Sequence, residues 1–316
     1  MGGFPVKYAL YTIIVLFIIL IIFLVIISVR YAGRVLYPNT RSYEEAKDNV
    51  TKQGYFPEAY IESLPYEKLD IRSPYGYIMK GRIYRNDSKK FVIIVHGITM
   101  NIYGALKYLP FFYEKGFNVV VFDQRNHGLT SGPNTTYGYF EKWDLRSITD
   151  HLFDHYGADI SVGLHGESMG GAISVLNMAI DKRIDFGVID CAFSDLPETL
   201  LMRFIEESHL NSKKMINFVN LFIKRKAGFS IEDVSPIREI PGIEKPILFI
   251  HGEKDTYVPS TTTKTMYAFK LHNKYLYLAK DGEHATSMAT DPDQYDEELT
   301  RFLNVVYPKS DFKEAH

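Results

Sequence analysis

The sequence of 316 residues contains a single cysteine, Cys191, so an intramolecular disulfide is impossible and a cysteine-based metal or redox motif is excluded. A strong charge bias is also missing: the formal net charge of -2 at pH 7 gives no reason to expect a nucleic-acid partner. No internal repeat and no low-complexity segment is evident. These absences leave an ordinary globular composition, whose 46% hydrophobic residues can fill a large core.

Charge is absent altogether between Lys7 and Arg30, and positions 13–27 hold only Ile, Leu, Val and Phe. A helix from Ala9 to Val29 would be about 31 Å long, which matches a hydrocarbon core of roughly 30 Å. The run is longer than that of a signal peptide, and no Ala-x-Ala cleavage site follows it. The sequence therefore predicts an uncleaved anchor over residues 1–30, which contacts the bilayer through residues 9–29.

Residues 31–65 are predicted to form a juxtamembrane connector with a short helix near residues 43–53. Segments 66–71 and 77–84 alternate apolar and polar residues, which predicts two antiparallel strands. Short continuous apolar runs then alternate with helical stretches, at residues 91–95, 118–122, 160–164, 186–189, 247–250 and 275–278. Such runs indicate a parallel sheet with helices on both faces, whose ligands bind at the carboxyl ends of the strands.

We therefore expect an α/β domain over residues 66–308, followed by a polar tail at 309–316. The strand pattern is interrupted at about residues 193–245, where two amphipathic helices are expected to form a small cap over the strand ends. Basic residues bracket the second helix and are either solvated charges or contacts to a membrane surface or an anionic substrate: Lys213, Lys214, Lys224, Arg225 and Lys226.

Residues 166–170, Gly-Glu-Ser-Met-Gly, stand between a buried strand and a helix that opens at Met169. The spacing is that of a nucleophile elbow, in which the glycines permit a tight turn and the helix amino terminus supplies positive potential for an oxyanion. A strand-to-helix turn with a capping serine is the alternative. We interpret Ser168 as a candidate nucleophile.

A serine nucleophile needs a base and an acid that orients the base. Asp255 follows the strand at 247–250 and His284 follows the strand at 275–278, so the chain order is Ser168, Asp255, His284. Asp190, which also ends a strand, is the competing acid. Other histidines are poorer candidates: His272 and His316 by position, and the pair His151 and His155 because no zinc-hydrolase glutamate follows His151.

An acyl-transfer site also needs N–H donors for the developing oxyanion, and each such donor contributes about 3 kcal/mol. The backbone N–H of Met169, directly after the serine, is one candidate. The second is the N–H of Ile98 in the sequence His-Gly-Ile-Thr at 96–99, where Gly97 permits close approach.

Five motifs resemble those of the α/β-hydrolase family, in the family's order: residues 96–99, 123–128 (Asp-Gln-Arg-Asn-His-Gly), 166–170, 251–255 (His-Gly-Glu-Lys-Asp) with 258–259, and 282–284 (Gly-Glu-His). The resemblance spans about residues 66–306 and is greatest to bacterial membrane-anchored serine hydrolases that are similar to carboxylesterases and prolyl-oligopeptidase-type domains. It implies an eight-stranded, mostly parallel sheet whose second strand is antiparallel. Asn126 stands where the family pattern has glycine, and no β-propeller precedes the domain.

Together these features predict a membrane-anchored serine hydrolase that cleaves a small-molecule carboxylic ester or thioester through an acyl-enzyme, without cofactor or metal. Cleavage of amides or short peptides is the alternative enzyme function, motivated by the doublet Gly170 and Gly171; a non-catalytic membrane-tethered binding protein is the alternative of another class. Lys and Arg residues after the span favour a cytoplasmic domain, whereas the resemblance suggests the cell surface.

Overall fold

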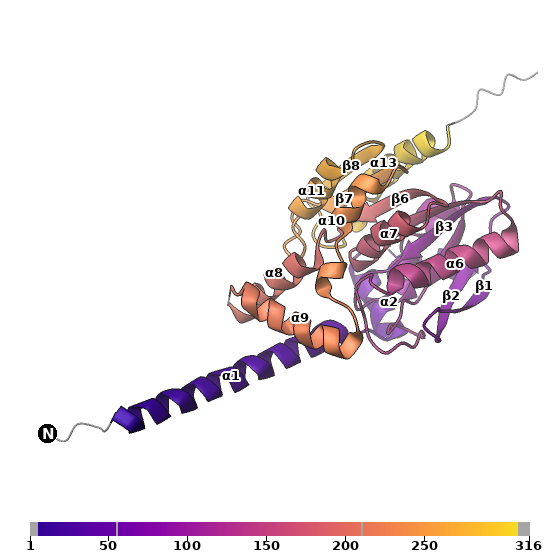
Figure 1. Ribbon diagram of the computed structural model, residues 1–316. Coiled ribbons are helices and arrows are strands. Elements are labelled where there is room, and N and C mark those ends of the chain that lie inside the picture. The colour runs from indigo at the N-terminus through magenta and orange to yellow at the C-terminus, as the bar shows by residue number, and fades with distance from the viewer. Residues whose placement is uncertain (1–5, 55, 210, 309–316) are drawn as a thin grey trace, which may run out of the picture.

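A computed structural model describes residues 6–54, 56–209 and 211–308, and its strands form one sheet in the order β1-β2-β4-β3-β5-β6-β7-β8 (Figure 1). β2 runs antiparallel to β1 and β4, and the other pairs are parallel. This confirms the predicted mostly parallel sheet. The strands are β1 (Glu67–Arg72), β2 (Ile78–Tyr84), β3 (Lys90–Val95), β4 (Asn118–Phe122), β5 (Ser161–Glu167), β6 (Ile184–Asp190), β7 (Ile247–Gly252) and β8 (Lys274–Ala279).

Helices cover both faces of the sheet, because each buried strand presents apolar side chains alternately to the two sides. In β3, Ile93 and Val95 face one apolar cluster, and Val92 and Ile94 face the other. The first cluster includes α6 (Glu141–Tyr156), α7 (Met169–Ile180) and α11 (Thr261–Phe269). The second includes α3 (Glu58–Ser63), α4 (Ile102–Leu106), α5 (Leu109–Tyr113), α12 (Ser287–Thr290) and α13 (Pro292–Val306).

The segment after β6 forms the two expected helices, α8 (Leu196–Ser208) and α9 (Lys213–Ala227). Leu200 and Phe204 of α8 and Val219 and Ile223 of α9 are buried against the domain. Three short helical turns that the sequence pattern did not predict follow: η1 (Ile231–Asp233), α10 (Pro236–Glu239) and η2 (Ile240–Gly242). Figure 1 shows α8 and α9 at the end of the domain from which α1 projects.

Helix α1 (Val6–Leu36) is long and apolar enough to cross a membrane, with a mean hydropathy of 3.6 in its most apolar window. It continues past Arg30, where the sequence suggested that the span ends and a connector begins. Its last turns bury four side chains in the core of the α/β domain: Tyr31, Ala32, Val35 and Leu36. The difference arises because a charge marks the end of a hydrocarbon segment and not the end of a helix, which tertiary packing can prolong.

The connector is bound tightly to the domain. Helix α2 (Tyr43–Lys52) forms as predicted and begins at a capping box between Ser42 and Glu45. Tyr43 donates a hydrogen bond to Asp123 at 2.6 Å, and the side chain of Asn101 donates to the backbone carbonyls of Arg41 and Ser42, both at 3.1 Å. These contacts place α2 beside the carboxyl ends of the strands.

Candidate active site

Ser168 lies at the junction of β5 and α7, and its backbone φ of 54° is one that residues other than glycine rarely adopt. Both flanking glycines are required by close backbone contacts. A Cβ on Gly166 would lie 2.3 Å from the carbonyl oxygen of Gly170, and a Cβ on Gly170 would lie 2.0 Å from that of Val95. The geometry is therefore the strained elbow that the motif predicted, and not an ordinary capped turn; the Ser168 side chain makes no capping bond.

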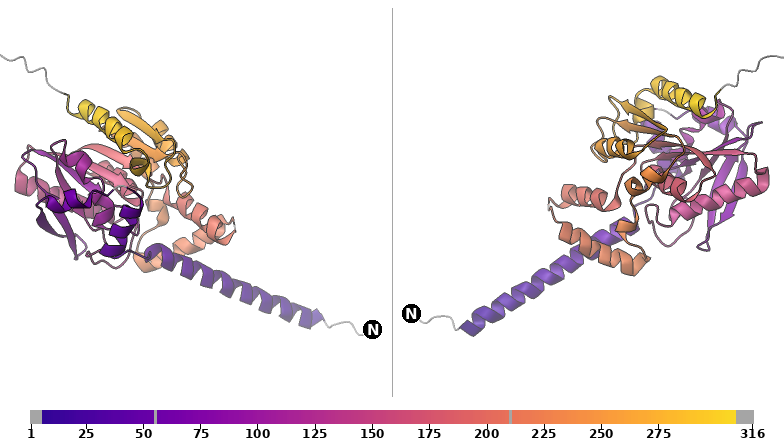
Figure 2. Two further views of the ribbon diagram at one scale, coloured as in Figure 1. Left: turned by 180° about the vertical axis from the view of Figure 1, so that it is seen from behind. Right: turned by 45° about the horizontal axis from the view of Figure 1, so that its top comes forward.

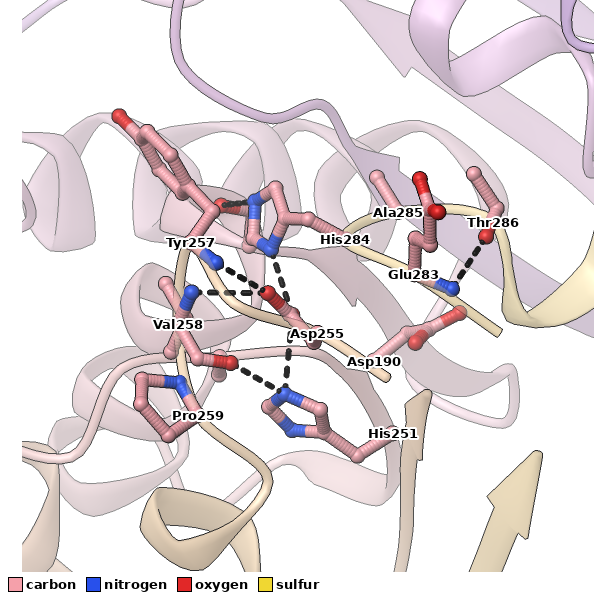
Figure 3. Close-up of polar contacts among 12 residues, drawn as sticks. Asp190, His251, Asp255, Tyr257, Val258, Pro259, Glu283, His284, Ala285 and Thr286 are labelled. Carbon is pink, nitrogen blue, oxygen red and sulfur yellow. Dashed lines mark hydrogen bonds and ion pairs between the residues drawn. The ribbon is translucent and has the colours of Figure 1, made fainter. Parts of the chain in front are cut away.

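The three residues proposed as a triad meet at the carboxyl ends of β5, β7 and β8. Ser168 Oγ lies 2.9 Å from His284 Nε2, and His284 Nδ1 lies 2.7 Å from Asp255 Oδ2. Figure 3 shows Asp255 between the rings of His284 and His251. Since Nδ1–H donates to the carboxylate, Nε2 is free to accept the serine proton.

Asp255 receives four hydrogen bonds. The backbone N–H groups of Tyr257 and Val258 donate to Oδ1 at 2.9 and 2.8 Å, and both histidines bind Oδ2. Burial alone would raise the pKa of Asp255, but the hydrogen bonds from His251, His284 and Val258 outweigh it and hold the pKa well below its usual range. Asp255 is therefore a carboxylate that can orient a base.

Asp190, the competing acid, points elsewhere. Its carboxyl accepts a hydrogen bond from Ser287 at 3.1 Å and lies 3.4 Å from the hydroxyl of Tyr108. Burial, assisted by the nearby charge of Glu167, raises the pKa of Asp190 to about 6. The structure thus favours Asp255 over Asp190 as the partner of His284.

The loop that holds Ile98 lies against the nucleophile, since a Cβ on Gly97 would come within 3.5 Å of Ser168 Cβ. His96 fixes this loop: its Nε2 accepts the Gln124 N–H at 3.1 Å, so its Nδ1–H donates to the Gly97 carbonyl at 2.8 Å. Burial lowers the pKa of His96 to about 3, so the ring is neutral. Ile98 and Ser168 line the same cavity, and the role of the Ile98 and Met169 N–H groups stays a prediction.

Two contacts were missed by sequence reasoning. The first is at His251, which opens the motif at 251–255. Its Nε2–H faces Asp255 Oδ2 at 3.0 Å and the Val258 carbonyl at 2.8 Å, while Thr263 donates to its Nδ1 at 2.7 Å. The position of His251 at the carboxyl end of a strand, four residues before Asp255, was the available signal.

The second missed contact is a buried ion pair behind the elbow. Lys107 Nζ lies 2.5 Å from Glu167 Oε2, and both side chains are almost fully buried. Lys107 also donates to the carbonyl of Ala285 at 3.1 Å, so it connects the residue before Ser168 to the residue after His284. No short motif marks such a pair, because its members come from separate elements.

The cavity at Ser168 and His284 has a volume of about 270 Å³. One wall comes from the connector, through Arg41, Asn49 and Gln53. The guanidinium of Arg41 donates to the Thr99 hydroxyl, and the Arg41 N–H donates to the Thr99 carbonyl at 2.8 Å. The connector is therefore part of the site, which its position before the domain did not suggest.

Among the described residues, one cluster has the composition of a metal site: Cys191, Asp255 and His284. Asp255 and His284 already hydrogen-bond to each other through the atoms that would bind a metal, and burial raises the pKa of Cys191 well above its usual range. The side chains of this cluster are therefore better suited to transferring a proton than to binding a cation. The rings of His151 and His155 on α6 are tilted, with centroids 3.8 Å apart, and neither residue lines the cavity.

Asn126, the departure from the family pattern, adopts a φ of 61°. This explains why glycine is usual at that position, and asparagine is among the residues that tolerate it best. Two residues on, a Cβ on Gly128 would lie 2.3 Å from the carboxyl of Asp123. The Asp123 loop thus needs a left-handed backbone at Asn126 and the absence of a side chain at Gly128.

Comparisons with known proteins give similarities at the level of sequence and fold. A family model described as the alpha/beta hydrolase fold matches residues 90–222. The uncharacterized protein YqkD of Bacillus subtilis is 33% identical over 281 residues, which cover 88% of this chain and 92% of the relative. The uncharacterized membrane protein YNL320W of Saccharomyces cerevisiae is 24% identical, with 83% and 85% covered. Among solved structures, the esterase Pf2001 of Pyrococcus furiosus superposes with a TM-score of 0.66 at 25% identity, covering 80% of this chain and 95% of the esterase.

Proposed function

The chain belongs to the α/β-hydrolase fold family and is a hydrolase, and from the arrangement at Ser168 we propose that it is a membrane-anchored serine hydrolase acting on carboxylic esters or thioesters. The observation that carries the proposal is the line of hydrogen bonds from Ser168 Oγ through His284 to Asp255, at 2.9 and 2.7 Å. Helix α1 serves as the anchor in this proposal.

The proposed mechanism begins when His284 Nε2 accepts the hydroxyl proton as Ser168 Oγ attacks the substrate carbonyl carbon. The N–H groups of Ile98 and Met169 stabilise the oxyanion of the tetrahedral intermediate. His284 then protonates the leaving alcohol or thiol, which leaves an acyl group on Ser168. Water, deprotonated by His284, attacks this acyl-enzyme, and collapse of the second intermediate restores the serine.

Esters are preferred over amides because solved neighbours of the fold include an esterase. The Gly170 and Gly171 doublet, which motivates the amide alternative, also has a packing explanation, since a Cβ on Gly171 would lie 2.9 Å from Ala192 Cβ. The doublet is therefore weak support for amide cleavage.

Labelling of the full-length protein with a fluorophosphonate tests the proposal. We expect labelling to disappear in Ser168→Ala and to fall strongly in His284→Ala. Ser174→Ala and His151→Ala are matched controls: Ser174 donates to the Gly170 carbonyl within α7, and neither residue lines the cavity. A folded wild-type protein that takes no label, or labelling that survives in Ser168→Ala, would contradict the proposal, and the binding-protein alternative would then be favoured.

Substrate preference is tested with unlabelled wild-type protein, by comparing its turnover of aryl esters with its turnover of aminoacyl amides. Faster ester turnover is expected. Faster amide turnover would reverse the order of the two enzyme functions.

A further inference from the structure

Helix α9 presents apolar side chains to solvent. Phe218 is 48% exposed, Leu221 is 58% exposed, and Phe222 is half-buried. Their spacing of three and four residues places them in one stripe along the helix. The opposite face packs on the domain through Met215, Ile216, Val219, Asn220 and Ile223. Phe222 also packs against the core, whereas Phe218 and Leu221 are left exposed and are available to a partner.

The stripe continues onto the apolar surface of α1. Phe222, Arg225 and Lys226 share a hollow of about 410 Å³ with Ala32 and neighbouring residues in the last turns of α1. Both views in Figure 2 place α9 against the end of α1 where that helix leaves the domain. Phe222 therefore joins the exposed stripe of α9 to the last turns of α1.

Basic residues flank the stripe at both ends. Lys213 and Lys214 precede it, and Lys224, Arg225 and Lys226 follow it. Within the described ranges, only Lys224 of these five makes an ion pair, with Glu232 at 3.8 Å. An apolar stripe between basic clusters is typical of helices that lie in the interface of a membrane, where each basic residue near an anionic surface contributes about 1 kcal/mol.

Depth along α1 agrees with this placement. If the hydrocarbon segment ends near Val29, then Tyr31 to Val35 lie roughly 3–9 Å further along the helix axis. The headgroup layer on each side of a bilayer is about 5–8 Å thick. The contacts between α1 and the α8–α9 pair are therefore at headgroup depth.

A second cavity connects this depth to the active site. It has a volume of about 330 Å³ and shares Ile98, Thr99 and Tyr257 with the cavity that contains Ser168. Its remaining walls include the last turns of α1 (Tyr31, Arg34, Val35) and helix α8 (Leu200, Arg203, Glu207). Tyr257 separates the two cavities: its ring lies 4.7 Å from that of His284 on one side and 3.9 Å from the Arg203 guanidinium on the other.

We propose that α9 lies in the interface of the bilayer that α1 spans, and that the substrate is an ester-bearing amphiphile drawn from that leaflet, which reaches Ser168 past α8 and Tyr257. The substrate class rests on the proposed serine-hydrolase function. The contact of α9 with the bilayer does not, so the two parts are tested separately.

The bilayer contact is tested with full-length protein in vesicles that contain anionic lipid and lipids carrying a doxyl quencher. The reporter is a new tryptophan, Phe218→Trp, in a Trp143→Phe background. Phe269→Trp is the matched control, because Phe269 is 53% exposed but ends α11, at the edge of the sheet opposite the active site. Strong quenching of the Phe218→Trp emission alone supports the contact; equal or absent quenching of both reporters overturns it.

The substrate class is tested by comparing a soluble ester, p-nitrophenyl butyrate, with 4-methylumbelliferyl oleate embedded in vesicles. Replacing two apolar residues in the interface, Phe218→Ser with Leu221→Ser, should lower the rate on the embedded ester by about tenfold and leave the soluble rate unchanged. The control pair, Phe269→Ser with Leu271→Ser, should alter neither rate.

Failure of the proposed function and failure of the inference give different results. If neither the wild-type protein nor any variant hydrolyses the soluble ester, the proposed serine-hydrolase function is wrong and the substrate class is wrong with it. The quenching experiment still decides whether α9 contacts the bilayer. If the soluble ester is cleaved but the embedded ester is not, or if both pairs of substitutions reduce the embedded rate equally, the substrate class is wrong.

Discussion

The catalytic end of the protein, around Ser168 and Asp255, and the region where α1 meets α9 are built in opposite ways. Buried Asp255 accepts hydrogen bonds from side chains and backbone groups at the ends of β7 and β8. At the elbow, the backbone contacts of Gly170 leave no room for a methyl group. Where α1 meets α9, apolar side chains are exposed beside an open hollow. Of the five basic side chains that flank the stripe on α9, only Lys224 forms an ion pair within the described part of the chain. The first region is complete within the protein, whereas the second leaves apolar surface that the described residues do not cover, as interaction sites do.

The largest expected effect separates the two buried carboxylates of the catalytic end. Asp255→Asn should lower kcat on a short aryl ester by about 10,000-fold, because the amide favours the wrong tautomer of His284. Asp190→Asn should change kcat far less, since Asp190 bonds to Ser287 and not to His284. Equal losses in the two variants would show that Asp190 takes part in orienting the base.

Two glycine substitutions compare the packing of the elbow at Gly170 with the packing of α1 at Gly33. Gly170→Ala should lower the free energy of unfolding by about 3 kcal/mol, because its Cβ meets the Val95 carbonyl oxygen at 2.0 Å. In Gly33→Ala of α1, the added Cβ would meet no atom within 4 Å. This substitution should raise the free energy of unfolding by about 0.5–1 kcal/mol, because alanine has the higher helix propensity. Denaturant midpoints in detergent measure both, and a neutral Gly170→Ala would contradict the close packing described for the elbow.

Changes in pH should affect the catalytic end with two opposite signs. The folded pKa of Asp255 is depressed, so its stabilising contribution is complete above about pH 4 and is lost as pH falls further. The folded pKa of Asp190 is raised to about 6, so the folded state holds its proton more tightly and stability falls by roughly 2 kcal/mol as pH rises from about 4 to 6.

Unfolding midpoints measured from pH 3 to pH 8 check these signs. Asp255→Asn should weaken the loss of stability below about pH 4, and Asp190→Asn should remove the loss between about pH 4 and pH 6. The reverse assignment of the two variants to the two pH ranges would show that the pKa of Asp255 is not lowered and that of Asp190 is not raised in the folded protein.

His251 sharpens the comparison within the catalytic end. His251→Phe removes the N–H that faces Asp255 Oδ2 and Val258 O, and should lower kcat by about tenfold with little change in KM. His251→Gln can supply an N–H donor and should recover part of the loss, which a purely structural role of the ring would not predict.

The smallest effect is expected where the two regions meet. Tyr257→Ala removes a ring between His284 and Arg203, an interaction of about 0.5–1 kcal/mol, and should lower turnover of the embedded ester about fivefold. Tyr257→Phe keeps the ring and should retain wild-type turnover. A loss in both variants would assign the effect to the hydroxyl.

Local patterns were sufficient to predict much of the sheet and the three residues that meet at its edge. Continuous apolar runs identified the parallel strands, because such strands are buried on both faces. Ser168, Asp255 and His284 could be chosen because each follows a strand, and the carboxyl ends of parallel strands meet at one edge. The structure places their side chains within 3 Å of hydrogen-bond partners, while their catalytic roles remain predictions.

Only the tertiary structure decided what covers each amphipathic face. Phe222 is apolar by residue type, but its place beside the last turns of α1 depends on residues almost 200 positions earlier in the chain. In the same way, Arg41 reaches the active site through Thr99, and His251 shares the carboxylate of Asp255. Sequence determines which side chains are apolar, strained or acidic; which of them meet depends on long-range packing that no local pattern records.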